Sequence, residues 1–159
     1  MNDIQIRVAG PDDAGEACSL LRRTIAEVCA LYYNNDETVL SEWLSNKTPE
    51  NVMSWINSES TYSIVAVNGH GDIVGFAILS VQEITLLYLL PEVLYKGVGK
   101  RMLQSLEEYA LKTGIKRVKV MSSIPARAFY ERNGYISNGE PEFVGPVLGH
   151  FPLIKTIAG

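Results

Sequence analysis

An almost wholly apolar segment, residues 83–90, leads into Leu94-Tyr95-Lys96-Gly97-Val98-Gly99-Lys100-Arg101, and apolar residues at helical spacing follow. Two glycines two positions apart let the backbone curl so that successive N–H groups point inward. The first turn of the following helix adds its own free N–H groups and the positive end of its dipole. Three basic side chains surround the turn. The pattern indicates a phosphate-binding turn between a strand and a helix.

Two common phosphate-binding motifs do not fit this turn. A Walker A loop needs glycine where Leu94 stands and a hydroxyl residue where Arg101 stands. A dinucleotide-binding fingerprint needs a third glycine at Met102 and belongs in the first βαβ unit of a chain. Taken alone, the stretch is also compatible with an ordinary glycine-containing turn.

The stretch resembles the pyrophosphate loop of the GNAT superfamily of acyl-CoA-dependent N-acyltransferases, Gln/Arg-x-x-Gly-x-Gly/Ala, and Pro91 precedes it at the family's usual interval. Leu94 departs from the pattern, because the family usually has Gln or Arg there. A second segment, SIPARAFYERNGY at residues 123–135, is similar to the family's Asn-x-x-Ala-x-x-Phe-Tyr-x-x-x-Gly-Phe. Two motifs in the family's order imply a GNAT domain that uses acetyl-CoA as co-substrate.

The spacing of apolar residues and turn residues predicts the secondary structure. Asp13 followed by Glu16 is typical of a helix capping box. The predicted elements are a strand at 4–8, a long helix at 13–31, short helices at 36–44 and 49–56, an antiparallel hairpin at 62–67 and 73–79, a central strand at 83–90, a helix from 99 to a stop at 114, a strand at 118–121, a helix at 125–132 and late strands at 135–136 and 147–157. With the resemblance, this order predicts a single α/β domain over residues 1–159 with the GNAT fold, a central mixed, mostly antiparallel sheet flanked by helices on both faces.

Composition limits the possible partners. The chain has 159 residues, 47% hydrophobic residues, a net charge of −4 and a sequence pI of about 5.2, which disfavours binding to nucleic acid or an anionic membrane. It has no apolar run of membrane-spanning length and no signal-like N-terminus, so we expect a cytoplasmic protein. Cys18 and Cys29 are expected to be buried free thiols, His70 and His150 exposed loop residues, and no metal site is indicated.

Two residues are candidates for catalysis. The resemblance places Tyr130 where the family's tyrosine faces the CoA sulfur, and a phenol can give a proton to a departing thiolate. The alternative is a tyrosine packed in the core. Glu83 lies as far before the glycine turn as the carboxylate that some family members use as general base; the alternative is an acid that ends the strand in solvent. Tyr88 and Glu92 are reserve candidates.

The resemblance also implies how the cofactor is held. The pantetheine arm is expected to bond like a short strand to the backbone of residues 87–89, where the central strand separates from its neighbour, with the Leu89 N–H facing the thioester oxygen. Lys100 and Arg127 are candidates for the nucleotide phosphates, although both are also compatible with solvated helix residues. The full set of expected cofactor-binding residues is Leu87, Tyr88, Leu89, Leu94, Tyr95, Lys96, Gly97, Val98, Gly99, Lys100, Ser123, Arg127 and Tyr130.

The predicted function is transfer of an acetyl group from acetyl-CoA to a primary amine, by direct attack through a tetrahedral intermediate and without a metal. The acceptor is a small molecule or a peptide amine. Its expected contacts are Tyr32, Tyr33, Trp43 and Glu142, with Glu140 and Phe143 nearby. The alternatives are a non-catalytic acyl-CoA-binding or sensing module and, less favoured, a domain that binds another nucleotide. Late strands that pair across a homodimer are compatible with the pattern but not required by it.

Overall fold

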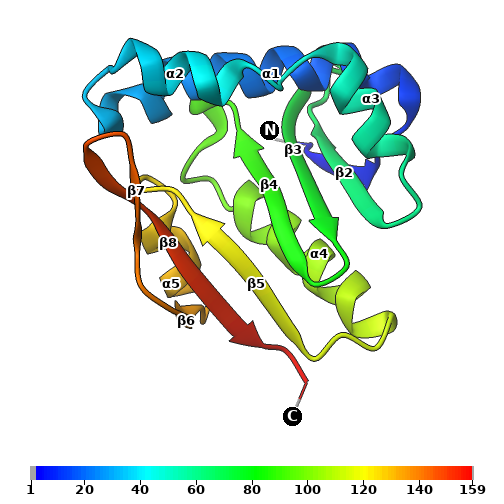
Figure 1. Ribbon diagram of the computed structural model, residues 1–159. Helices are drawn as coiled ribbons and strands as arrows, with labels where there is room; N and C mark the ends of the chain where they lie inside the picture. The colour runs from blue at the N-terminus through cyan, green and yellow to red at the C-terminus, as the bar shows by residue number, and fades with distance from the viewer. Residues whose placement is uncertain (1–2, 159) are drawn as a thin grey trace.

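The computed structural model describes residues 3–158, which form one mixed sheet with helices on both faces (Figure 1). The strands are β1 (Gln5–Val8), β2 (Thr61–Val67), β3 (Ile73–Ser80), β4 (Glu83–Leu89), β5 (Arg117–Ser122), β6 (Ile136–Ser137), β7 (Glu142–Val144) and β8 (Val147–Thr156). The helices are α1 (Ala14–Glu27), α2 (Glu37–Leu44), α3 (Pro49–Asn57), α4 (Val98–Lys112) and α5 (Arg127–Arg132), with short 3₁₀ turns η1 (Pro11–Asp13), η2 (Cys29–Tyr33) and η3 (Pro91–Val93).

The sheet has the order β1-β2-β3-β4-β5-β8-β6, and β7 pairs with the first part of β8. Among the strands of residues 3–158, only the β4–β5 pair is parallel, and every other pair is antiparallel. The expected hairpin is confirmed as β2 and β3, whose turn is held by the Asn68 side chain, an acceptor for the N–H groups of His70 and Asp72. The predicted fold class, a mixed and mostly antiparallel sheet in one α/β domain, is therefore confirmed.

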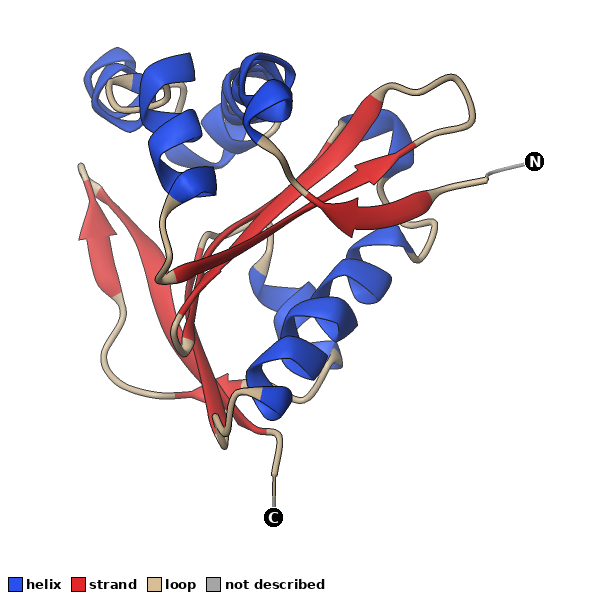
Figure 2. Cartoon of the chain, turned by 90° about the vertical axis from the view of Figure 1, so that its right-hand side faces the viewer, coloured by secondary structure: helices blue, strands red, loops and turns tan. Residues whose placement is uncertain are grey.

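Helices cover the two faces of the sheet separately (Figure 2). Strand β3 shows the division clearly, because its successive side chains point to opposite faces. Phe76 and Ile78 pack with α1 and α3 residues, whereas Ala77 and Leu79 pack with the buried stripe of α4. Both cores meet at the central strands, so β3 is buried along almost its whole length.

The connection from β4 through α4 to β5 forms a parallel crossover, but the two strands stay together for a short distance only. Glu83 pairs with Lys119 and Ile84 with Val120, and no further β4–β5 pair follows within residues 3–158. A bulge at Thr85 lies just beyond this point, where the β3–β4 register shifts. The C-terminal part of β4 is therefore paired with β3 on one side and separated from β5 on the other (Figure 1).

Several local predictions need correction. Helix α1 ends at Glu27, and a 3₁₀ turn follows it. Asp13 does not cap α1, because its carboxylate accepts from Arg7 and from the Gly10 N–H. Glu16 instead accepts the N–H of Ile73 at 2.8 Å and so ties α1 to β3. His150 was expected in an exposed loop, yet it lies half-buried in β8, opposite Glu142 of β7.

Candidate active site

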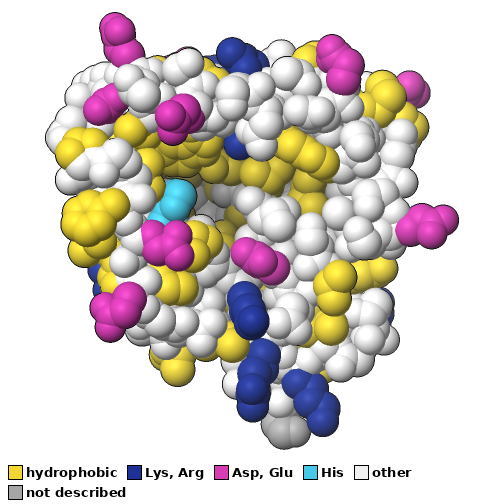
Figure 3. Space-filling view, viewed as in Figure 1, with side chains coloured by type: hydrophobic (Ala, Val, Ile, Leu, Met, Phe, Trp, Pro, Cys, Tyr) yellow, Lys and Arg dark blue, Asp and Glu magenta, His cyan; other side chains and the backbone are white. Residues whose placement is uncertain are grey.

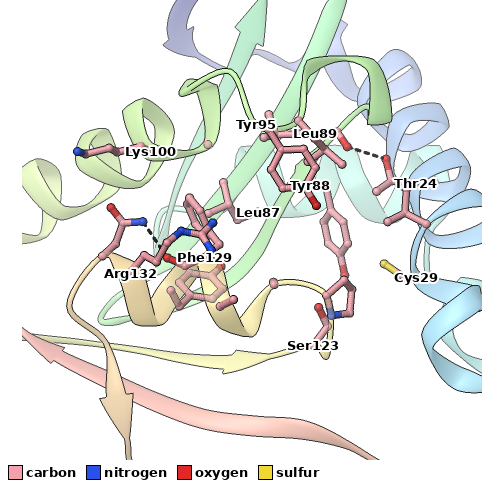
Figure 4. Close-up of a pocket in the computed structure, with 18 of the residues that line it drawn as sticks. Thr24, Cys29, Leu87, Tyr88, Leu89, Tyr95, Lys100, Ser123, Phe129 and Arg132 are labelled. Carbon is pink, nitrogen blue, oxygen red and sulfur yellow. Dashed lines mark hydrogen bonds between the residues drawn. The ribbon is translucent and has the colours of Figure 1, made fainter.

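The separation of β4 from β5 opens a cavity of about 630 Å³ between the end of β4, the glycine turn, α1 and α5. Figure 4 shows side chains from these elements around one space. The residues that line the cavity are Thr24, Val28, Cys29, Tyr32, Leu87, Tyr88, Leu89, Leu94, Tyr95, Gly97, Gly99, Lys100, Ser123, Pro125, Ala126, Ala128, Phe129, Tyr130, Arg132 and Asn133. This volume is typical of a small-molecule binding site.

The backbone at the end of β4 offers hydrogen-bonding groups to the cavity. The N–H of Leu90 bonds to the Val74 carbonyl of β3 at 2.9 Å. Because neighbouring residues of an antiparallel strand direct their polar groups to opposite sides, the groups of Leu89 and Leu87 face the gap beside β5. The Leu89 carbonyl accepts from the Thr24 hydroxyl at 3.3 Å (Figure 4). The edge of β4 can therefore bind an extended ligand as a strand would.

The glycine turn has the geometry that the sequence predicts. Gly97 has φ of 83°, a left-handed conformation that glycine adopts without strain, and it precedes the first residue of α4. A Cβ on Gly99 would lie 3.2 Å from both Leu89 and Phe129, so glycine lets α4 approach the cavity wall closely. Lys100 lines the cavity. Arg101 points elsewhere, because its guanidinium donates to the Ile4 carbonyl at 2.9 Å.

Tyr130 comes from α5 and is only 3% exposed, with its ring packed edge-on between Phe129 and Tyr135 at 5.2 and 5.4 Å. Burial raises the pKa of the Tyr130 phenol, so the hydroxyl stays protonated at neutral pH. Within residues 3–158 this hydroxyl makes no hydrogen bond, although Tyr130 lines the cavity. A held, protonated and unpartnered phenol is available to a ligand.

The α1 side of the cavity contributes residues that we did not predict. In the sequence, Thr24 and Val28 belong to the apolar stripe of the predicted helix and Cys29 is expected to be a buried thiol. Only their place near the C-terminal end of that helix distinguishes them from other core positions. Burial raises the pKa of the Cys29 thiol to about 12. Burial is also the largest cause of the raised pKa of the Tyr88 phenol. These groups are therefore neutral at physiological pH.

The α5 segment contributes Phe129, Arg132 and Asn133 in addition to the predicted Ser123 and Tyr130. All three belong to the segment with the family resemblance. Arg132 is the basic residue that this helix presents to the cavity, in the place that we expected Arg127 to take. The Asn133 side chain donates to the Phe129 carbonyl at 2.8 Å and so closes the end of α5.

The structure leaves several predicted residues outside the cavity. Arg127 forms an ion pair with Glu131 at 3.3 Å, and its guanidinium stacks over the Phe151 ring. Its positive charge therefore interacts with other residues of the protein. Lys96 precedes the two glycines and Val98 lies between them, and neither lines the cavity. Glu83 is exposed at the start of β4, beside Lys119 of β5, and the structure does not bring it together with Tyr130.

Of the residues predicted to contact the acceptor, some line the cavity and others do not. Tyr32 lines the cavity. Tyr33 is 2% exposed, and its hydroxyl donates to the Gly149 carbonyl at 2.8 Å and accepts from the Ile124 N–H at 3.1 Å. Trp43 packs edge-on against Tyr33 at 5.2 Å, and Glu142 lies exposed in β7. Tyr33 and Trp43 thus support the site rather than line it. Glu140 and Phe143 are both exposed.

Two further properties concern the part of the chain that the structure describes. None of its helices has the length and apolar character needed to span a bilayer. Its His, Cys, Asp and Glu side chains form no group of three suited to a metal ion.

Comparisons with known proteins agree with this architecture. Residues 24–157 match the family described as "Acetyltransferase (GNAT) domain". The chain therefore belongs to the GNAT acetyltransferase family, as its two motifs predicted. Comparison with curated proteins finds no significant match.

Solved structures share the fold at low sequence identity. PaiA N-acetyltransferase from Thermoplasma acidophilum, in complex with coenzyme A, has a TM-score of 0.82 at 20% identity over 97% of this chain and 99% of that chain. A GCN5-related N-acetyltransferase from Rhodopseudomonas palustris has a TM-score of 0.81 at 21% identity over 96% and 94%. Apo YjaB from Escherichia coli has a TM-score of 0.67 at 20% identity over 98% and 99%.

Proposed function

We propose that this protein transfers an acetyl group from acetyl-CoA to a primary amine by direct attack, through a tetrahedral intermediate. The observation that carries the proposal is the separation of β4 from β5, which leaves the Leu87 and Leu89 backbone groups facing the cavity. The family uses acetyl-CoA, and a structural relative was crystallised with coenzyme A. When bound, acetyl-CoA would supply the activated thioester.

The residues of the cavity suit such a ligand from end to end. The free N–H groups at the start of α4 and the Lys100 ammonium would hold the pyrophosphate, because helix N-termini and cations both favour anions. The β4 edge at Leu87 and Leu89 would bond the amides of the pantetheine arm. The Leu89 N–H would also donate to the thioester oxygen as negative charge develops there.

Tyr130 is the proposed proton donor to the leaving thiolate, and the proton that the attacking amine loses as the amide forms returns the phenolate to its neutral form. Tyr130 lines the cavity, and its hydroxyl stays protonated and has no hydrogen-bond partner within residues 3–158. Cys29 is unsuited to a covalent acyl-enzyme, because a thiol with a pKa of about 12 is almost wholly un-ionised at neutral pH. Direct transfer to the amine is thus favoured over transfer through the enzyme. Glu83 has no proposed role, because it lies outside the cavity.

Steady-state kinetics of the Tyr130→Phe variant test the assignment. We expect kcat to fall by about 10²- to 10⁴-fold, the usual contribution of general acid catalysis, with little change in the KM for acetyl-CoA. Tyr135→Phe is the matched control, since Tyr135 is a buried neighbour that bonds to Glu107 and does not line the cavity. An unchanged kcat in Tyr130→Phe would remove Tyr130 as the acid. A large loss with an altered pH profile in Glu83→Gln would restore Glu83 as a base.

Ligand binding is tested separately from turnover by thermal shift. At 100 times its Kd, acetyl-CoA should stabilise the protein by about 2.7 kcal/mol, or about 5–10 °C, whereas ATP and NAD should not. Stabilisation by CoA species without acetylation of any amine would favour a non-catalytic acyl-CoA-binding module. The absence of any shift with CoA would contradict both functions.

A further inference from the structure

A second cavity, of about 260 Å³, lies on the face of the sheet that α1 and α3 cover. Figure 3 views this face and shows it hollowed below the helices, with many apolar side chains around the hollow. The cavity is lined by Asn46, Lys47, Trp55, Thr61, Ile78, Ser80, Thr85 and Leu86. Its lining contains one charged residue, Lys47, and no acid.

The loop that carries Lys47 is fixed by its backbone. The Lys47 carbonyl accepts from Arg22 at 2.9 Å and from the Cys18 thiol at 3.2 Å, and its N–H donates to the Leu44 carbonyl at 3.0 Å. Arg22 also donates to Leu44 at 2.9 Å. Two residues of α1 therefore hold this loop over the cavity.

The Lys47 side chain is nearly enclosed and lacks a counter-charge. The residue is 8% exposed, and its ammonium donates to the neutral Asn46 amide at 2.8 Å. No carboxylate within residues 3–158 lies at ion-pair distance from it. Burial lowers the pKa of the Lys47 ammonium. A buried cation is costly unless it is paired, so an anion that enters this cavity would gain a strong interaction.

The two cavities lie beside neighbouring positions of β4. Leu86 lines the second cavity and Tyr88 lines the first. Both side chains pack on the same face of the sheet, and residues two apart on a strand are separated by about 7 Å. The two cavities are therefore close along β4, and a ligand that extended from one to the other would have Lys47 at one end and the opening beside Leu89 at the other.

We propose that Lys47 binds a carboxylate of the acceptor, so that the amine acetylated by this protein belongs to a molecule of the amino-acid class. The proposal rests on the proposed function and names its substrate class. A carboxylate is favoured over a phosphate because it carries a single negative charge, which one ammonium balances, whereas a phosphate monoester carries about 1.5 to 2. The distance along β4 favours a carboxylate and an amine separated by several bonds.

Matched acceptors test this proposal. The wild-type protein is assayed for CoA release with ω-amino acids of increasing length, from glycine to 6-aminohexanoate, and with the alkylamine of equal length for each. We expect an amino acid of suitable length to exceed its alkylamine by about 10- to 100-fold in kcat/KM, the usual effect of one charge-assisted hydrogen bond. Equal rates for each pair, or a preference for phosphoethanolamine, would overturn the proposal.

Variants connect the preference to Lys47. In Lys47→Met the KM for the preferred amino acid should rise by about 10- to 100-fold while the KM for acetyl-CoA stays unchanged, and Lys47→Arg should recover part of the loss. Lys112→Met, which removes an exposed lysine at the end of α4, is the control. An unchanged acceptor KM in Lys47→Met would overturn the proposal.

A binding measurement keeps the proposal apart from the proposed function. Calorimetric titration of 6-aminohexanoate and hexylamine into the CoA-saturated protein should show tighter binding of the acid in wild type and equal binding in Lys47→Met. If no amine is acetylated, the proposed function fails, and this titration still decides whether Lys47 binds a carboxylate. Equal binding of both ligands by wild type would reject the carboxylate site.

Discussion

Asp13 shows how a single carboxylate joins β1 to the start of α1. It accepts from the Arg7 guanidinium at 2.8 and 3.0 Å and from the Gly10 N–H at 2.8 Å. The hydrogen bond from Arg7 is the largest cause of the lowered pKa of Asp13. Because the folded-state pKa lies below the unfolded value of about 3.9, the stabilisation is complete above that value and is lost as pH falls through the folded pKa.

Asp13→Asn should therefore destabilise the protein by about 1–2 kcal/mol at pH 7. The difference from wild type should shrink as pH falls below about 5 and vanish once the wild-type carboxyl is protonated. Urea denaturation at pH 7, 4 and 2.5 measures it. Asp12→Asn changes an exposed neighbour and serves as the control. A wild-type advantage that persists undiminished at pH 2.5 would show that the charge is not responsible.

Ser63 is a buried polar residue whose removal should stabilise the protein. Its hydroxyl has no hydrogen-bond partner within residues 3–158, and the residue is 4% exposed. Ser63→Ala should raise the free energy of unfolding by about 1 kcal/mol, and the Tm by about 2–4 °C, because it removes an unpaired group from the core. Thr61→Val on the same strand should do the opposite, since the Thr61 hydroxyl donates to Trp55 and Ser58 carbonyls at 2.6 and 3.1 Å. Loss of stability in both variants would contradict this reading.

For single residues, the sequence predicted correctly those whose role depends on the local backbone conformation. Its predictions failed for residues whose position depends on packing against distant parts of the chain. Gly97 and Gly99 were found because a tight turn before a helix restricts the residue type. Tyr33 was expected to line a cavity, yet it is buried, because Gly149 of β8 leaves room for its ring; a Cβ there would overlap it. That contact joins residues 116 positions apart in the sequence, so the local sequence pattern around Tyr33 does not predict it.

Among the elements, α4 and β8 are joined by a small polar cluster. Glu107 of α4 accepts from the Tyr135 hydroxyl at 2.8 Å and from the Lys155 ammonium at 3.2 Å. Tyr135 is fully buried, so the loss of this acceptor would leave its hydroxyl without a partner. The cluster fixes α4, which begins at the glycine turn, against the β5–β8 half of the sheet.

Glu107→Ala should lower the free energy of unfolding by about 2–3 kcal/mol, because it leaves a buried hydroxyl and a partly buried ammonium unpaired. Glu108→Ala, at the exposed neighbouring position, should change it by less than about 0.5 kcal/mol. Chemical denaturation of both variants measures the difference. Equal losses would show that helix propensity, rather than the cluster, accounts for the effect.

The helices and strands were predicted where the apolar pattern within the segment is enough to define the element. The β2–β3 hairpin, β4 and α4 have strong periodicity and clear turn residues, and all are present near their expected bounds. Strand β7 was not predicted, because residues 142–144 are short and mostly exposed and depend on pairing with β8. The separation of β4 from β5 was expected only through family resemblance, since sequence alone does not show where two distant strands stop pairing.

At the scale of the whole molecule, the sheet consists of two halves that share few strand contacts. Strands β1–β4 form one antiparallel half, and β5–β8 form the other. Two residue pairs, between the start of β4 and the middle of β5, join them. A ligand in the opening would hydrogen-bond to β4 where β5 does not. The amides of Leu87 and Leu89 should accordingly be the positions whose hydrogen exchange responds most to the cofactor.

Amide exchange with and without CoA tests this expectation. In the free protein, Leu87 and Leu89 should exchange faster than Ala77 of β3, which is flanked by β2 and β4. CoA should slow the exchange of the Leu87 and Leu89 amides by at least about tenfold. The reason is that its pantetheine arm would accept hydrogen bonds from these N–H groups or exclude water from them. Adenosine 3′,5′-bisphosphate, which has no such arm, should bind at the glycine turn and leave Leu87 and Leu89 fast. Equal protection by both ligands would mean that the opening closes through movement of the two halves, and the β4 edge would then not be the binding strand.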